Sequence, residues 1–174
     1  MKNSLLGRVV GLILLITACS KNKPEFGGIR VKLTDAPAAY KKVLIDIKEV
    51  QIHNVPKAGK SDWISLPTTS GIYDLLTLQN GIDSTIVNTT QLEEGKITEM
   101  RLLLGDNNFV VDSMGVTHNL TVPSGSQTGI KITGPIQIKP NTTVQVLIDF
   151  DAEKSVVVNG NNEYHLQPVI KVVD

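Results

Sequence analysis

The sequence predicts an all-β protein: an antiparallel β-sandwich preceded by a helical signal segment. Two features of the chain point to this class. From Gly27 onward the apolar residues recur mostly at every second position, with many Val, Ile and Thr among them, which is typical of half-buried strands. Short runs of Gly, Pro, Asn and Asp separate these stretches, and turns at such close spacing favour a sandwich over a parallel sheet.

Residues 1–18 have the organisation of an export signal. Lys2 and Arg8 supply positive charge, and an apolar run ends at residues 12–16 without any acidic residue. A membrane-spanning helix needs about 20 predominantly apolar residues, whereas this run stops at Thr17. Residues 1–18 are therefore expected to form a cleaved lipoprotein signal peptide.

The residues before Cys19 make it a candidate lipid-attachment site. Ile16-Thr17-Ala18-Cys19 resembles the bacterial lipobox, in which the cysteine thiol receives a diacylglycerol, the peptide is cut before the cysteine, and the new amino terminus is acylated, with palmitate as a usual acyl chain. Cys19 is also the only cysteine, so the exported domain is expected to contain no disulfide.

Residues 19–26 are expected to form the lipidated cysteine and a short tether, and residues 27–174 a single domain. The tether after Cys19 extends to at most about 25 Å, which keeps the domain close to a bilayer. The signal holds two of the 17 basic residues and none of the 17 acidic ones, so the mature chain is slightly acidic. This balance argues against nucleic acid as a partner.

The residues after Cys19 favour the outer membrane. Ser20 resembles the outer-membrane default, because it is not the aspartate that retains some lipoproteins at the inner membrane. Surface export often uses an acidic cluster nearby, yet Lys21 and Lys23 are basic and Glu25 stands alone. The leaflet, periplasmic or surface, stays open.

Alternation predicts the strands in order along the chain. The clearest cases are residues 29–33, 43–52 and 144–150, and a shift in phase within the second predicts a bulge near Lys48-Glu49. Residues 96–104 begin with alternation and end as a continuous apolar run, as in a strand that finishes in the core. The other predicted strands are residues 63–66, 109–112, 117–122, 129–133, 136–139, 155–158 and 163–173.

Helix is expected to be scarce. The best short candidates are residues 38–41, 75–78 and 90–94, where Thr90 or Gln91 would open a turn that ends at Gly95.

Three segments together carry a family resemblance. The first is Gly28-Ile29-Arg30-Val31-Lys32-Leu33-Thr34-Asp35-Ala36-Pro37, with the strand at 40–52. The second is Leu75-Leu76-Thr77-Leu78 with residues 92–102, and the third runs from Asp149-Phe150-Asp151 to residues 164–170. In this order they resemble the bacterial domain-of-unknown-function family 4382, seen mainly in lipoproteins of the Bacteroidota. The resemblance implies an immunoglobulin-like or transthyretin-like sandwich and no established activity, so it transfers no catalytic residue.

The sequence does not contain the common catalytic motifs. There is no Gly-x-Ser-x-Gly nucleophile motif, and His53, His118 and His165 are widely separated, without a His-Glu-x-x-His pattern or a cysteine partner for zinc. Each histidine lies in or near a predicted strand, where solvent or a hydrogen bond would satisfy it. We therefore predict no catalytic residues and no cofactor.

One acidic cluster is a weak candidate for calcium. Asp149, Asp151 and Glu153 recur at every second position, so their oxygens would face one side together, and calcium prefers six to eight oxygen ligands. The stretch has neither the Gly nor the distant Glu of an EF-hand loop. An acidic turn at the end of a strand, with repulsion relieved by Lys154 or Arg101, is the default interpretation.

Sugar binding is allowed by the sequence but not signalled by it. Aromatic residues are only 4% of the chain, and the single tryptophan, Trp63, stands beside Ile64 and Leu66 as a core anchor would. Tyr40, Tyr73 and Tyr164 are candidate rim contacts. Asp83-Ser84-Thr85 and Asp112-Ser113-Met114 resemble a short O-glycosylation acceptor of exported proteins.

The leading hypothesis for function is a non-catalytic binding or assembly module, held at the envelope by lipid and facing an envelope protein or a glycan. A second hypothesis makes the domain a passive structural accessory of a surface complex. A third gives it a hydrolytic site that the motifs do not reveal. The sequence identifies neither the ligand nor the oligomeric state.

Overall fold

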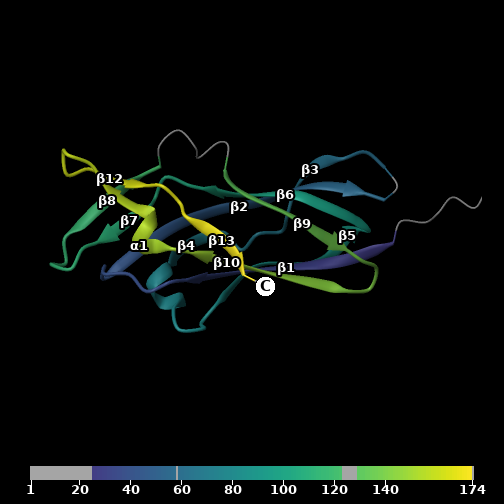
Figure 1. The fold of residues 1–174 in the computed structure, drawn as a ribbon, viewed down its shortest axis with the longest axis horizontal. Helices are drawn as coiled ribbons and strands as arrows, with labels where there is room; N and C mark the ends of the chain where they lie inside the picture. The colour runs from purple at the N-terminus through teal and green to yellow at the C-terminus, as the bar shows by residue number, and fades with distance from the viewer. Residues whose placement is uncertain (1–24, 58, 123–128, 174) are drawn as a thin grey trace, which may run out of the picture.

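The computed structural model describes residues 25–57, 59–122 and 129–173, so the signal segment and Cys19 lie outside the described residues. The described chain is mostly strand (Figure 1). Its elements are β1 (Phe26–Asp35), β2 (Lys42–Pro56), β3 (Asp62–Ser65), β4 (Gly71–Asp74), the 3-10 helix η1 (Leu75–Leu78), β5 (Ser84–Glu93), β6 (Gly95–Leu104), β7 (Phe109–Val111), β8 (Thr117–Thr121), β9 (Ile130–Ile138), β10 (Thr143–Phe150), α1 (Ala152–Ser155), β11 (Val156–Val158), β12 (Tyr164–Leu166) and β13 (Ile170–Val173).

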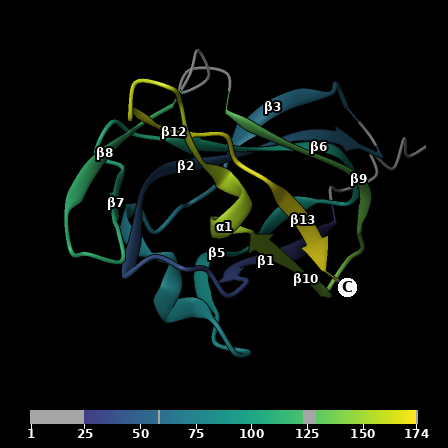
Figure 2. The same ribbon diagram turned by 60° about the vertical axis from the view of Figure 1, so that its left-hand side comes forward.

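The strands form two stacked sheets (Figures 1 and 2). The smaller sheet has the order β13-β10-β1-β5, and the larger has the order β11-β12-β8-β7-β2-β6-β9, with β3 and β4 also paired to β2. Alternate residues of both sheets enter one buried apolar cluster, to which β1 contributes Ile29 and Val31 and β2 contributes Val50 and Ile52. The predicted all-β sandwich is confirmed.

Strand β2 is the central strand of the larger sheet and runs for 15 residues. It pairs with β7 and β4 in its first half, with β3 in its second half, and with β6 along most of its length. The register against β6 shifts between Ile47 and Glu49, which places a bulge at Lys48. The bulge predicted from the phase shift in the sequence is therefore confirmed.

Two strand pairs are parallel, which the sequence did not predict. β1 lies parallel to β10 from the Gly28–Thr143 pair to the Asp35–Phe150 pair, and β12 lies parallel to β8. The partners in both pairs are far apart in sequence. Alternation within a strand reports which face is buried but not which strand lies beside it, so this part of the topology has no local signal.

Of the three helix candidates, only residues 75–78 form a helix, the 3-10 helix η1, whose N-cap Asp74 accepts a hydrogen bond from the Leu76 amide at 3.3 Å. Residues 38–41 form no helix, with bends at residues 39–41, and residues 90–93 belong to β5. The sequence also missed α1, because its four residues are too few to show a helical period. Asp151 caps α1 and accepts a hydrogen bond from the Lys154 amide at 3.1 Å.

Some strand bounds differ from the prediction. Residues 130–138 form one strand, β9, where the sequence suggested two, and the stretch 163–173 is divided into β12 and β13 around Pro168. A proline has no backbone N–H for a ladder, which explains the division. Among the described residues, no helix has the length and apolar character needed to span a membrane.

Candidate functional site

Two hollows lie side by side where the larger sheet extends through β7, β8 and β12. The first, of about 390 Å³, is lined by residues 105–109 and 119–122, and the second, of about 420 Å³, is lined by residues 118, 119, 121 and 162–165. Asn119 and Thr121 of β8 line both. We call the combined surface the β8 groove. In both ribbon views, β8 and β12 lie next to each other at one end of the molecule (Figures 1 and 2).

The alternation of β8 makes the floor of the groove polar. Leu120 is buried, so its neighbours Asn119 and Thr121 point to the opposite face of the sheet and are exposed. Asn119 lies opposite Phe109 of β7, and Thr121 lies opposite His165 of β12. The side chains of Asn119 and Thr121 have no hydrogen-bond partner among the described residues, which leaves both available to a ligand.

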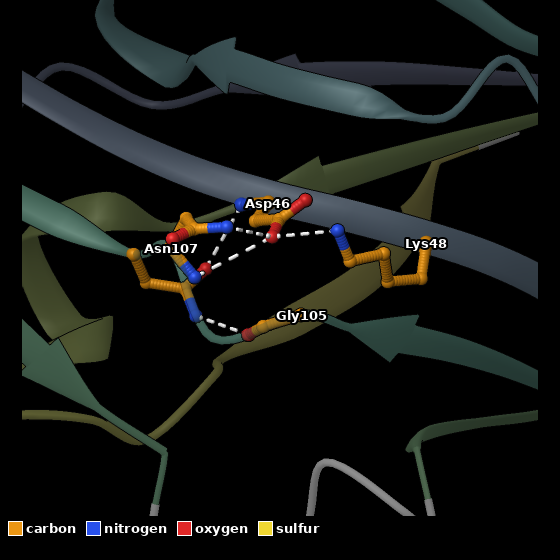
Figure 3. Close-up of polar contacts among 5 residues, drawn as sticks. Asp46, Lys48, Gly105 and Asn107 are labelled. Atoms are coloured by element: carbon orange, nitrogen blue, oxygen red, sulfur yellow. Dashed lines mark hydrogen bonds and ion pairs between the residues drawn. The ribbon is translucent and has the colours of Figure 1, made fainter.

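One wall of the groove is the turn between β6 and β7, which is held by the buried carboxylate of Asp46 (Figure 3). Asp46 Oδ2 lies 2.9 Å from Lys48 Nζ and accepts hydrogen bonds from Asn107 Nδ2 at 3.2 Å and from the Asn107 amide at 3.4 Å. Asn108 completes the turn, because its Oδ1 accepts from the Asp46 amide at 2.9 Å and its Nδ2 donates to the Gly105 carbonyl at 2.6 Å.

The electrostatics of Asp46 favour the charged form. Burial alone would raise the pKa of this carboxyl, but the Lys48 ammonium and the hydrogen bonds from Asn107 outweigh burial and hold the pKa below its ordinary value of 3.8. Asp46 is therefore ionised at neutral pH and fixes Asn107 at the edge of the groove.

The opposite wall is the turn between β11 and β12, organised by Asn159. Its Oδ1 accepts hydrogen bonds from the amides of Asn161 and Glu163, and its Nδ2 donates to Glu163 Oε2 at 2.7 Å and reaches His165 Nε2 at 3.1 Å. Asn162 has a φ of 57°, in the left-handed region that asparagine tolerates better than most residues. A single side chain thus sets the shape of this wall.

His118 also lines the second hollow. Its Nε2 lies 2.9 Å from Asp112 Oδ2, and its ring stacks on Tyr164 with centroids 4.1 Å apart. The hydrogen bond with His118, together with the amides of Val116 and Met114, lowers the pKa of the Asp112 carboxyl. This histidine therefore has a structural role in the turn between β7 and β8.

The three histidines are not brought together. His53 Nδ1 contacts Thr98 Oγ1 at 2.8 Å, His118 contacts Asp112, and His165 contacts Asn159. Each histidine thus makes one local contact of the expected kind, but His165 Nδ1 is buried without a hydrogen-bond partner among the described residues. Among the described residues, no group of three or more His, Cys, Asp or Glu side chains could hold a metal ion.

The calcium candidates Asp149, Asp151 and Glu153 separate in the fold. Asp149 lies buried on β10, Asp151 caps α1 and pairs with Lys154 Nζ at 2.5 Å, and exposed Glu153 accepts a hydrogen bond from the Ala39 amide at 2.7 Å. The arrangement matches the default interpretation, an acidic turn at the end of a strand in which Lys154 relieves the repulsion. Arg101 lies elsewhere, over Trp63.

Trp63 is not a core anchor, contrary to the sequence interpretation. It lies half-buried on β3, opposite His53 and on the face of the larger sheet turned away from the core. The Arg101 guanidinium sits 3.5 Å from its ring centroid, and the His53 ring 5.4 Å away. All three candidate tyrosines pack against the core, and among them Tyr164 also lines the groove.

Sequence reasoning missed most residues of the β8 groove. The Asn-rich segments 105–108 and 159–162 fall between the predicted strands, and Asn119 lies within the predicted strand at residues 117–122. Ser113, in the second O-glycosylation pattern, is exposed in the turn after β7, and Ser84, in the first, is half-buried on β5.

A family model described as a domain of unknown function, DUF4382, matches residues 26–168. That span contains every residue that lines the β8 groove. No curated protein and no solved structure matches the chain.

Proposed function

The chain belongs to the DUF4382 family, a domain of unknown function, and on this premise we propose that it is a lipid-anchored envelope protein whose β-sandwich is a non-catalytic binding module. The β8 groove is its binding surface. The observation that carries the proposal is the shared floor of two adjacent hollows, in which the side chains of Asn119 and Thr121 have no hydrogen-bond partner among the residues that the structure describes.

Rigid walls support a binding role. The side chains of Asp46 and Asn159 each hold one wall through several hydrogen bonds, so the groove keeps its shape without a ligand. A preformed site loses little conformational entropy when it binds, which favours affinity even for a shallow surface.

The contacts that the two groove histidines, His118 and His165, already make support a non-catalytic role. His118 is held by Asp112 and Tyr164, and His165 Nε2 lies against the amide of Asn159. A general base must reach the proton that it removes, within about 2.6–3.2 Å or through one water. Both imidazoles already use a ring nitrogen to hold a turn. Turnover of ester, peptide or glycoside substrates by the purified protein would refute this part of the proposal.

Cys19 is the proposed anchor, and the outer membrane is the proposed location. Cys19→Ser should abolish palmitate labelling and leave an uncut or soluble chain, because about 0.8 kcal/mol per buried methylene makes two or three acyl chains a firm anchor. Ser20→Ala is the matched control and should keep both labelling and membrane fractionation. Protease added to intact cells distinguishes the two leaflets, and recovery in the inner-membrane fraction would refute the location.

The groove itself is tested by blocking it. Asn119→Arg places a long charged side chain on the floor shared by both hollows, and it should abolish crosslinking of the protein to its envelope partners. Asn88→Arg is the control, because Asn88 is an exposed strand asparagine on β5, in the other sheet. Unchanged crosslinking by Asn119→Arg would instead favour a passive accessory that docks through another face.

A further inference from the structure

We propose that the β8 groove binds a neutral, hydroxyl-rich glycan segment. This inference rests on the proposed function, in which the groove is the binding surface, and it adds the chemical class of the ligand. Three properties of the lining lead to it: the hydrogen-bonding groups, the balance of charge, and the extent of the two hollows.

The hydrogen-bonding groups match vicinal hydroxyls. A sugar hydroxyl both donates and accepts, and it is bound best by groups that offer both functions in a fixed plane. Asn107, Asn119 and Asn162 present side-chain amides, which donate and accept, and Asp106 and Glu163 present carboxylates, which accept. The lining thus combines amides with carboxylates, and both kinds of group can bind the hydroxyls of a glycan.

The charge balance disfavours an anionic ligand. No Lys or Arg is among the described residues that line the two hollows, whereas two carboxylates are. An anionic ligand, such as a phosphorylated or uronic acid-containing chain, would meet repulsion without a cation to offset it. A lipid or another apolar ligand would leave the amides and carboxylates desolvated without partners, which costs free energy for each group.

The two hollows suit an extended chain rather than a single small molecule. Each has the size of a small-ligand pocket, for which about 300 Å³ is the lower bound, and they share Asn119 and Thr121. A glycan of several residues would therefore lie across β8 with neighbouring sugars in neighbouring hollows. Phe109, half-buried beside Asn119, offers an apolar surface to the C–H face of one ring.

The test is binding of purified full-length protein in detergent to an array of neutral and acidic oligosaccharides. Titrations with maltoheptaose, cellohexaose, mannohexaose and hexagalacturonate then follow. At least one neutral oligosaccharide should bind at least tenfold more tightly than the acidic one. Asn119→Ala should weaken that binding at least tenfold, because it removes a donor and an acceptor from both hollows. Asn88→Ala, the matched control on β5, should change it less than twofold.

Several outcomes would overturn the inference: no binding to neutral glycans, preference for the acidic hexamer, binding to peptides alone, or equal effects of Asn119→Ala and Asn88→Ala. The crosslinking experiment with Asn119→Arg separates the two proposals. If that variant loses its envelope partners but no glycan binds, the glycan inference is wrong and the binding function stands. If neither partner nor glycan depends on Asn119, both are wrong.

Discussion

Asp35 is a buried carboxyl at the end of β1 whose surroundings favour the protonated form. Burial raises its pKa to about 6, against hydrogen bonds from the Ala152 amide at 2.9 Å and from Gln79 Nε2 at 3.2 Å, which lower it. The negative charge of nearby Asp149 adds to the increase. Near pH 6, a small change in acidity therefore changes the charge at the point where β1 meets α1.

The sign of the resulting pH dependence follows from linkage. The folded chain holds the Asp35 proton more tightly than the unfolded chain, in which the pKa is 3.8, so stability from this proton is fully present below about pH 3.8. As the pH rises from 3.8 to about 6, this contribution to the free energy of unfolding is lost, by up to about 3 kcal/mol. Asp35→Asn keeps an acceptor for Ala152 and should remove this loss in urea unfolding between pH 4 and 7. Asp106→Asn, at an exposed site, should not.

A pH-independent difference between wild type and Asp35→Asn would contradict the assignment of the elevated pKa to Asp35.

Asp46 has the opposite dependence. Because its pKa is lowered in the folded chain, its stabilisation is present above pH 3.8 and is lost as the pH falls through the folded pKa. Asp46→Ala removes the acceptor for Asn107 and the partner of Lys48, and should lower the free energy of unfolding by about 1–3 kcal/mol at pH 7. Exposed Asp106→Ala is the control. The difference in free energy of unfolding between wild type and Asp46→Ala should shrink toward pH 3. A difference that grows toward pH 3 would be inconsistent with an ionised Asp46.

Single strands with a clear period of two could be predicted from the sequence, and β2 is the best case. Its alternation, including the bulge at Lys48, is local information, because each residue reports its own face. β5 could not be predicted in the same way. Ile86 and Val87 are buried in succession where the register against β1 shifts between Val31 and Lys32, so its pattern depends on a neighbouring strand.

The candidate site could not be predicted from the local sequence either, because its residues meet only through contacts between segments that are far apart in the chain. Thr121 meets His165 only because β12 lies parallel to β8, although 44 positions separate the two residues. Asn107 reaches the groove only because Asp46, on a distant strand, is buried beneath it. Neither pairing has a short-range signature, whereas the segments that build both walls could be placed between predicted strands.

The turn between β6 and β7 depends on a glycine with no room for a side chain. A Cβ at Gly105 would lie 2.2 Å from Asp46 Oδ2 and 2.3 Å from Lys48 Cε, in the middle of the contacts that hold Asn107. Gly105→Ala should therefore lower the free energy of unfolding by about 1–3 kcal/mol and move the amide resonances of residues 106–108.

Gly160→Ala is the matched control for Gly105→Ala. A Cβ at Gly160, in the turn after β11, would meet nothing within 4 Å, so its unfolding midpoint in urea should stay near that of wild type. Equal effects of the two substitutions would show that the crowding at Gly105 is not what fixes this wall.

The start of β1 and the β8 groove lie at opposite ends of the molecule. Figure 1 shows the start of β1 at one end of the longest axis and β7, β8 and β12 at the other. The Glu94 amide donates to the Glu25 carbonyl at 2.7 Å, which places the start of β1 beside Pro56 at the end of β2, whereas Lys42 at the start of β2 pairs with β7. At ~3.3 Å per residue, the 15 residues of β2 separate the two ends by about 46 Å.

A chain anchored at Cys19 should therefore direct the β8 groove away from the bilayer, although the tether itself is short. Because Cys19 is the only cysteine, coupling it to maleimide lipid in nanodiscs reproduces the anchor without the cell's lipidation machinery. With a gadolinium-chelating lipid in the disc, the amide signals of Asn141 and Thr142, beside the start of β1, should lose intensity. The signals of Met114 and Gly115, in the turn between β7 and β8, should keep it.

Coupling through Ser113→Cys in a Cys19→Ser background should reverse this pattern, because Ser113 is exposed at the groove end of the molecule. Loss of the Met114 and Gly115 signals under Cys19 coupling would mean that the domain lies along the bilayer, with the groove within reach of lipid headgroups. The groove would then meet partners in the membrane plane. In the expected pattern, the β8 groove is open to long glycans or proteins that approach from the aqueous side. The 15 residues of β2, at ~3.3 Å each, place the groove about 46 Å from the start of β1.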